Sequence, residues 1–315
     1  MTARPRPLVL AVVVGTGVVA VSTGALFTRA AYQAAGAGTL GGGLLLALSR
    51  MGVTCLLSSG AWARRARRPG PLPPGTRRRT VVAGLLLGLH FATWLPSLAF
   101  TSIAASVTLV TTVPIWVALM MWLRGERPSA RSAAGIAIAV AGGALVAFGD
   151  AGGADAGSNP LLGDALALVA AITFAAHLML SRSVQQRGLG LWQWTSVVTA
   201  IGFLTVLPLG LLVAPGDGPY PLGFWLAAVG LALVPQMVGH SSFTWSVRWL
   251  SPTLVSVAIL LEPLLSSLGG IVLFDEVPGP LVAVGAVVLV AGVAVTTVAE
   301  SGSAPTPAEE AVIPT

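Results

Sequence analysis

Long apolar segments separated by short polar breaks make up almost the whole chain. Ten segments each hold about 20 mostly apolar residues, the length that an α-helix needs to cross a bilayer. None of them alternates apolar and polar residues as a membrane-barrel strand does, so each is predicted to be a helix. The ten predicted spans are Leu8–Phe27, Leu40–Trp62, Thr80–Ala99, Ile103–Leu123, Arg131–Phe148, Leu161–Ser181, Trp194–Val213, Leu222–Trp245, Thr253–Phe274 and Pro280–Ala299.

The first segment also resembles a secretory signal peptide, because a basic start precedes its apolar run. This run is longer than the hydrophobic region of most signal peptides, and nine more apolar segments follow it. We therefore expect a retained first helix.

Composition supports a membrane protein. Hydrophobic residues form 55% of the 315 residues and charged residues only 9%, whereas soluble domains carry about 25% charged residues. So few charges cannot cover a surface that faces water. The fold class expected is therefore an all-α integral membrane protein with ten transmembrane helices.

The basic residues predict the orientation. All 17 are arginine, and with a cytoplasmic N-terminus 15 of them fall in cytoplasmic pieces; Arg29 falls outside and Arg50 lies within a span. Basic residues of short loops stay in the cytoplasm, so both termini are predicted to be cytoplasmic. The run RRARRPGPLPPGTRRR then indicates a loop beside anionic lipid headgroups, with no nucleic acid as partner.

The sequence also argues against several activities. Without lysine there is no Walker A loop and no Schiff-base chemistry, and neither HExxH nor GxSxG occurs. Cys55 is the only cysteine, which excludes an intrachain disulfide or a cysteine metal cluster. We therefore expect no enzyme, no catalytic residue, no cofactor and no metal site.

The chain contains an internal repeat. The stretch Val113–Gly143 aligns with Glu262–Val293: Pro114 matches Pro263, and the positions further along match at an offset of 150. The later matches are Glu126 with Glu276, Pro128 with Pro278, Gly135 with Gly285 and Gly142 with Gly292. The two acids, each just before a proline, are predicted to cap the turn into the helix that follows.

The repeat predicts two domains of five spans, residues 1–148 and 161–299, followed by a disordered cytoplasmic tail at 300–315. Because five is odd, the second half is predicted to enter the membrane upside down relative to the first. Inverted repeats with interrupted helices are typical of secondary transporters, in which two halves rock around a site near the middle of the membrane.

Two stretches, LAFTSIAASVTLVTTVPIWVALMMWLRGERPS and LSPTLVSVAILLEPLLSSLGGIVLFDEVP, resemble the signature segments of the drug/metabolite transporter superfamily. Arg50 and the segment GDALALVAAITFAAHLMLSR add to the resemblance, which is closest to the ten-helix EamA-type branch and covers about residues 8–299. The resemblance implies an inverted-repeat fold with both termini inside. It also implies export or exchange of amino acids, metabolites or drugs through a central cavity.

Glu262 and Pro263 stand in the middle of a span, where both carry a cost. A charge at the bilayer centre costs about 2.5–3.5 kcal/mol on insertion scales, and Pro263 leaves the carbonyl of Ile259 without its helical partner. These costs are tolerable where the helix face lines a cavity. Glu262 is then a residue that takes up and releases a proton, or a neutral residue that stabilises the kink through a hydrogen bond to a neighbouring helix.

Arg50 lies at a similar depth and needs a partner, because its guanidinium stays charged. It is interpreted as a gating partner of Glu262, as an anchor for a substrate carboxylate, or as a structural link to helix-end carbonyls; we favour the last. Further candidates for the substrate or proton pathway are histidines and tryptophans within spans: His90, His177, His240, Trp94 and Trp116.

The sequence thus predicts a secondary exporter of a small metabolite, amino acid or drug in the bacterial cytoplasmic membrane, coupled to protons through Glu262. The alternative is a passive facilitator or channel in which Glu262 only shapes the pore. The partners expected are a small-molecule substrate and the lipid bilayer, with the protein as a monomer or homodimer.

Overall fold

The computed structural model describes residues 5–61, 75–125, 129–151, 157–187, 189–213, 219–250 and 252–301. Within these ranges the chain forms helices joined by short turns, without a strand. The predictions made for Glu126, for Pro128 and for most of the basic loop and the tail lie outside the described residues.

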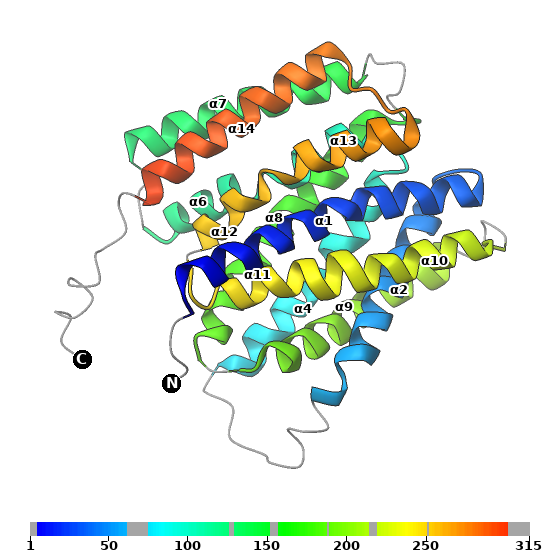
Figure 1. Ribbon diagram of the computed structural model, residues 1–315, viewed down its shortest axis with the longest axis horizontal. Coiled ribbons are helices and arrows are strands. Elements are labelled where there is room, and N and C mark those ends of the chain that lie inside the picture. The colour runs from blue at the N-terminus through cyan, green and yellow to red at the C-terminus, as the bar shows by residue number, and fades with distance from the viewer. Residues whose placement is uncertain are drawn as a thin grey trace.

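The helices lie side by side with their axes roughly aligned, and the start of the first lies on the same side as the end of the last (Figure 1). They are α1 (Pro7–Ala35), α2 (Leu40–Ser58), α4 (Thr76–Ser97), α5 (Ile103–Val110), α6 (Val113–Leu123), α7 (Ala130–Ala151), α8 (Pro160–Gln185), α9 (Leu191–Val213), α10 (Leu222–Leu231), η2 (Ala232–His240), α11 (Ser241–Ser246), α12 (Pro252–Ile259), α13 (Glu262–Phe274) and α14 (Pro280–Ser301).

Local sequence signals set several helix ends. The side-chain oxygens of Thr39, Ser102 and Asn159 accept hydrogen bonds from backbone N–H groups in the first turns of α2, α5 and α8. The helix α1 ends just before Gly36, whose positive φ of 84° suits glycine.

Helices that are long and apolar enough to cross a membrane correspond to seven of the predicted spans, and the other three predicted spans contain shorter apolar helices. The seven are Pro7–Ala35, Leu40–Ser58, Thr76–Ser97, Ile103–Leu123, Pro160–Gln185, Leu191–Val213 and Leu222–Ser246. The shorter three are Ala130–Val146, Glu262–Phe274 and Pro280–Thr296.

Three of these segments are irregular near their middle. The fourth predicted span breaks at Thr111–Thr112 between α5 and α6, and the ninth breaks at Leu260–Leu261 between α12 and α13. The eighth continues from α10 through the π-helix η2 into α11, with Pro235 inside η2. Proline explains the position of all three, because it removes one backbone donor and collides with the preceding turn.

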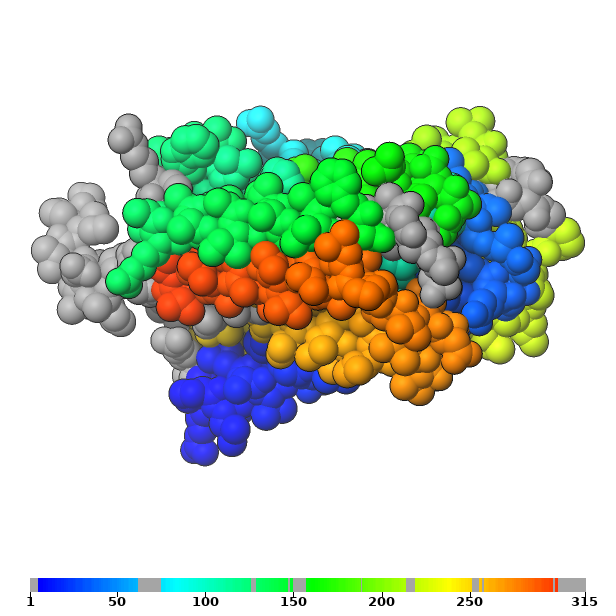
Figure 2. Space-filling model, turned by 90° about the horizontal axis from the view of Figure 1, so that it is seen from above, coloured from blue at the N-terminus to red at the C-terminus, as the bar shows by residue number. Residues whose placement is uncertain are grey.

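The helices α7 and α14 pack closely along one face of the molecule, where Figure 2 shows them side by side. Gly142 makes this approach possible, since a Cβ atom there would overlap the backbone of Leu289 and lie 2.8 Å from the Gly285 carbonyl oxygen. Small residues that let helix backbones touch are a common packing device in membranes. This pairing joins α7, the last helix of the predicted first half, to α14, the last helix of the predicted second half.

Replacing Gly142 with alanine tests this contact. We expect the variant to lose about 1–3 kcal/mol of stability, the usual cost of forcing extra volume into a packed site. Gly143→Ala is a matched control, because a Cβ atom there meets its nearest neighbour, Leu289 Cδ1, at 3.6 Å. Thermal melting in detergent measures both, and equal melting temperatures would contradict the close packing of α7 on α14.

Candidate functional site

The two broken helices meet at a small cavity in the middle of the molecule. Thr111, at the break between α5 and α6, and Glu262, at the start of α13, both line it. The cavity has a volume of about 30 Å³, which suits a water molecule and is too small for an organic solute. The other residues that line it are Val21, His90, Trp94, Val110, Val113, Phe174, His240, Phe243 and Ile259.

Glu262 is buried, with 6% of its surface exposed, and is the first residue of α13. A carboxylate at this position interacts favourably with the N-terminal end of the helix dipole. Among the described residues no hydrogen bond to its carboxyl group is present, so no such bond anchors it to a neighbouring helix. Pro263 follows in the first turn of α13, where the lack of an N–H group is tolerated.

His90 and His177 bind two helices together. The ring Nδ1–H of His90 on α4 donates to the Ala170 carbonyl of α8 at 2.9 Å, and that of His177 on α8 donates to the Ala83 carbonyl of α4, also at 2.9 Å. A carbonyl accepts only, which fixes the proton on Nδ1 and leaves Nε2 of a neutral ring as an acceptor. Both histidines therefore have a structural contact, and His90 also faces the cavity.

His240 stands at the end of η2 and differs from the other two. Its ring makes no hydrogen bond to the described residues, and its centroid lies 5.2 Å from that of Phe174 and 6.2 Å from that of His90. His240 lines the central cavity and a second, smaller one that also contains His177, Trp194 and Gln236. Among the three histidines it is the one that connects the two cavities.

Arg50 is fully buried on α2. Its Nε donates to Gln236 Oε1 at 2.8 Å, and its guanidinium carbon lies 4.0 Å from the centroid of the Phe91 ring. Among the described residues, Arg50 thus contacts an amide oxygen and the face of an aromatic ring. A contact with Glu262 or with a helix-end carbonyl is not present there.

The two tryptophans that the sequence singles out have different places. Trp94 is buried and lines the central cavity, beside Arg50 and His90. Trp116 donates its indole N–H to Thr112 Oγ1 at 3.0 Å and lines an apolar groove of about 730 Å³ between α6, α7 and α8. The structure therefore does not bring Trp116 to the cavity at Glu262.

Gln236 and Phe91 were not predicted as site residues. Of these residues only Gln236 had a signal in the sequence that could have marked it as a site residue: it is an amide in an apolar segment and directly follows a proline. Phe91 and Phe174 carry none, because phenylalanine in a membrane span is ordinary. Among the described residues, no three histidine, cysteine or acidic side chains come together as metal ligands.

Comparison with known proteins supports a transporter. Residues 161–298 match the EamA-like transporter family. The chain is 23% identical over 205 residues to an uncharacterized transporter of Archaeoglobus fulgidus, which covers 65% of this chain and 71% of that protein. A crystal structure shares the fold with a TM-score of 0.62 and 23% identity, over 95% of this chain and all of the other.

The family match includes the second of the two signature segments and supports the resemblance drawn from it. The family match covers the second predicted half, the part that contains Glu262 and Pro263.

The bond between Gln236 and Arg50 is open to a direct test. Replacing Gln236 with leucine leaves the buried guanidinium without its amide acceptor, and we expect a loss of about 1.5–3 kcal/mol of stability. The double variant Arg50→Met/Gln236→Leu removes the charge as well and should recover part of this loss. Thermal melting of Arg50→Met, of Gln236→Leu and of the double variant measures the coupling. Additive losses of stability would show that the two residues do not interact.

Proposed function

We propose that this member of the EamA-like transporter family is a secondary exporter of a small metabolite, amino acid or drug across the bacterial cytoplasmic membrane. It is not an enzyme in this proposal. The observation that carries it is Glu262: a buried carboxyl group without a hydrogen bond to the described residues, facing a cavity where two helices break. Intramembrane acids in such places commonly belong to substrate or proton pathways.

The proposed architecture is ten membrane-spanning helices in two inverted halves, residues 1–148 and 161–299. One contact pattern supports it. Gly135 corresponds to Gly285 and Gly142 to Gly292 in the repeat, while in the structure Gly135 approaches Gly292 and Gly142 approaches Gly285. Such exchanged pairs are what a two-fold relation between equivalent helices produces.

The proposed mechanism is competition between a proton and the solute at Glu262. A carboxyl group away from water favours its neutral form, and a bound polar solute favours the charged form. Solute binding then releases the proton, and proton binding releases the solute. Because one site holds only one of them at a time, the flux of each drives the other.

The neighbouring side chains have different proposed roles. His240 and Trp94 contact the solute, while Arg50, held by Gln236, supplies a nearby positive charge. His90 and His177 position α4 and α8 around the site through their carbonyl contacts. The cavity of about 30 Å³ must widen to admit a solute, so the proposed cycle includes an opening of this site.

The proposed partners are the solute and the lipid bilayer, with the protein as monomer or homodimer. Solutes can be found by a release or toxicity screen with the gene overexpressed. Reconstituted liposomes then separate the exporter from a passive facilitator: an exporter accumulates an accepted solute against its gradient when a proton gradient is imposed. Flux that only follows the solute gradient would favour the facilitator.

The proposed orientation predicts which positions an impermeant thiol reagent reaches in whole cells. In a Cys55→Ala background, we expect Ala37→Cys and Ser158→Cys to react, because both lie in loops assigned to the outside. Gln186→Cys, in a turn assigned to the cytoplasm, should not react. All three positions are exposed in the structure. The opposite pattern, or equal reaction at all three, would contradict the inverted topology.

Glu262→Gln tests the coupling. Glutamine keeps the shape and hydrogen-bonding capacity of the side chain and cannot titrate, so we expect normal folding, residual binding of the solute and loss of the pH dependence of flux. Val113→Glu, which puts an acid at the position before Pro114, should not rescue the variant. Asp275→Asn removes an exposed acid and is the matched control. An unchanged pH profile in Glu262→Gln would move the search for the coupling residue to His90, His177 and His240.

A further inference from the structure

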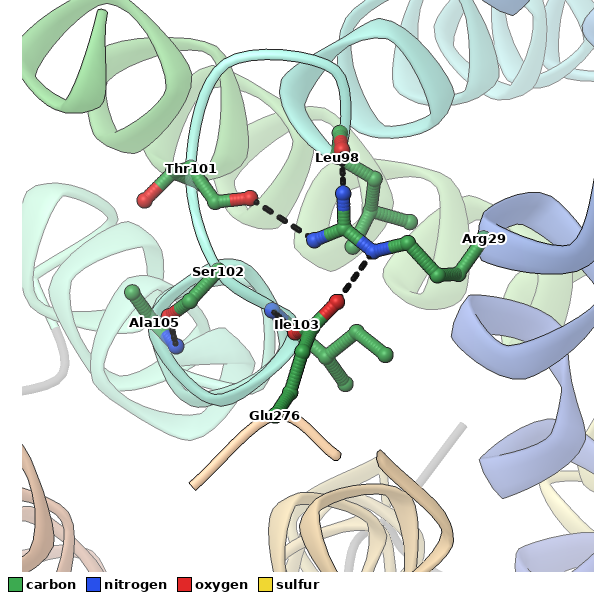
Figure 3. A network of polar contacts seen from close by, with 7 residues as sticks. All are labelled: Arg29, Leu98, Thr101, Ser102, Ile103, Ala105 and Glu276. Carbon is green, nitrogen blue, oxygen red and sulfur yellow. Dashed lines mark hydrogen bonds and ion pairs between the residues drawn. The ribbon is translucent and has the colours of Figure 1, made fainter. Parts of the chain in front are cut away.

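Arg29 and Glu276 join the two halves of the protein at one end of the molecule. Arg29 lies near the end of α1, and Glu276 follows the end of α13; their side chains form an ion pair through Arg29 Nε and Glu276 Oε1 (Figure 3). The sequence predicted that Glu276 caps the turn into α14. In the structure the contacts of its carboxylate go instead to α1 and to the start of α5.

Three hydrogen bonds extend the ion pair. Arg29 donates from Nη1 to the Leu98 carbonyl at 2.9 Å and from Nη2 to the Thr101 carbonyl at 3.1 Å, and Glu276 Oε2 accepts from the Ile103 amide at 3.0 Å. These groups belong to the turn between α4 and α5 and to the first residue of α5 (Figure 3). We call this set of contacts, centred on Arg29 and Glu276, the clasp.

The clasp holds together the helices that lead to the central cavity. From Ile103 at the clasp, α5 runs to Val110 at the cavity, about 10 Å along the helix axis. The helix α13 begins at Glu262, which lines the cavity. It ends at Phe274, two residues before Glu276 of the clasp. The same α13 is tied to α1 further in, where the Ser266 hydroxyl donates to the Ser22 carbonyl at 2.9 Å.

The clasp can open more easily than the buried charge at Arg50. Its two charged side chains keep 18% and 17% of their surface exposed, so water can hydrate both charges when they separate. A fully buried charge that lost its partner would meet no water. An ion pair at a boundary with water is therefore suited to repeated making and breaking.

From this geometry we infer that the clasp is a gate that closes the path between the cavity and this end of the molecule, and that Arg29 and Glu276 must separate for a solute to pass. The inference rests on the proposed transport function. With the orientation proposed above, this end faces the outside of the cell. The two halves would then be locked together on that side while the clasp is closed.

Thiol accessibility tests the gate without a known solute. In a Cys55→Ala background, Val110→Cys places one thiol at the cavity. Adding Glu276→Gln removes the charge that holds Arg29. We expect an impermeant maleimide then to react with the thiol at position 110 at least about fivefold faster than it does without Glu276→Gln. Asp275→Asn removes the neighbouring exposed acid, which has no part in the clasp, and should leave the rate unchanged. Arg29→Gln is a second opening variant if Glu276→Gln folds poorly.

Whole cells and inverted vesicles show from which side the reagent enters. A faster reaction that is specific to the clasp variants supports the gate. An unchanged rate in Glu276→Gln and Arg29→Gln, or an equal rise in Asp275→Asn, would overturn it and leave the clasp as a fixed structural link.

Locking the gate gives the complementary test. Arg29→Cys/Glu276→Cys in the same background, joined by a short cleavable bifunctional maleimide, should stop solute flux in liposomes, and cleaving the linker should restore it. Full flux through the joined protein would overturn the gate. If the unmodified protein moves no solute at all, the transport proposal fails, while the accessibility test still decides the gate.

Discussion

Hydrocarbon offers no hydrogen-bond partner to a backbone group, and this constraint shapes the rest of the structure. A helix satisfies its own carbonyl and amide groups, so most of the chain is helical. The breaks at Thr111–Thr112 and Leu260–Leu261 interrupt the ladder of helical hydrogen bonds. Thr111 at the first break, and Ile259 and Glu262 on either side of the second, line one cavity. The irregular backbone and the buried acid therefore occur together, because each needs the same shelter from lipid.

Two arginines show how burial sets what a charge can do. Arg50 has no exposed surface, and its contacts with Gln236 and Phe91 hold it in one arrangement. Arg29 keeps part of its side chain exposed, and its guanidinium contacts two carbonyl oxygens and a carboxylate oxygen. Separating Arg29 from Glu276 should cost less free energy than separating Arg50 from its partner, because water can hydrate part-exposed charges. The same residue type thus stands fully buried beside an amide and an aromatic ring at one place, and in a part-exposed ion pair at the other.

The sequence predicts the helices well, because hydrophobic length and proline act locally. Predicted and observed ends of α2, α9 and α14 agree at one terminus each, and Pro263 lies at the break that it was expected to make. Contacts between distant residues were not predictable from such signals. The partner of Arg50 is 186 positions away, and the amide of Ile103 is 173 positions from Glu276. The capping role assigned to Glu276 was local, whereas its contacts in the structure are with Arg29 and the Ile103 amide, both far away in the sequence.

The histidines show why a residue type alone does not identify a site. All three histidines in apolar helices were candidates from the sequence, yet two of them donate to carbonyls across the same pair of helices, α4 and α8. Their Nδ1–H groups are committed to holding those helices at a fixed spacing. His240 has no such bond to the described residues and ends a π-helical stretch, a rare form of helix that often occurs at functional sites. His240 thus faces the cavity without a bond that ties it to a neighbouring helix of the described chain, whereas the bonds of His90 and His177 hold together two helices that form the cavity wall.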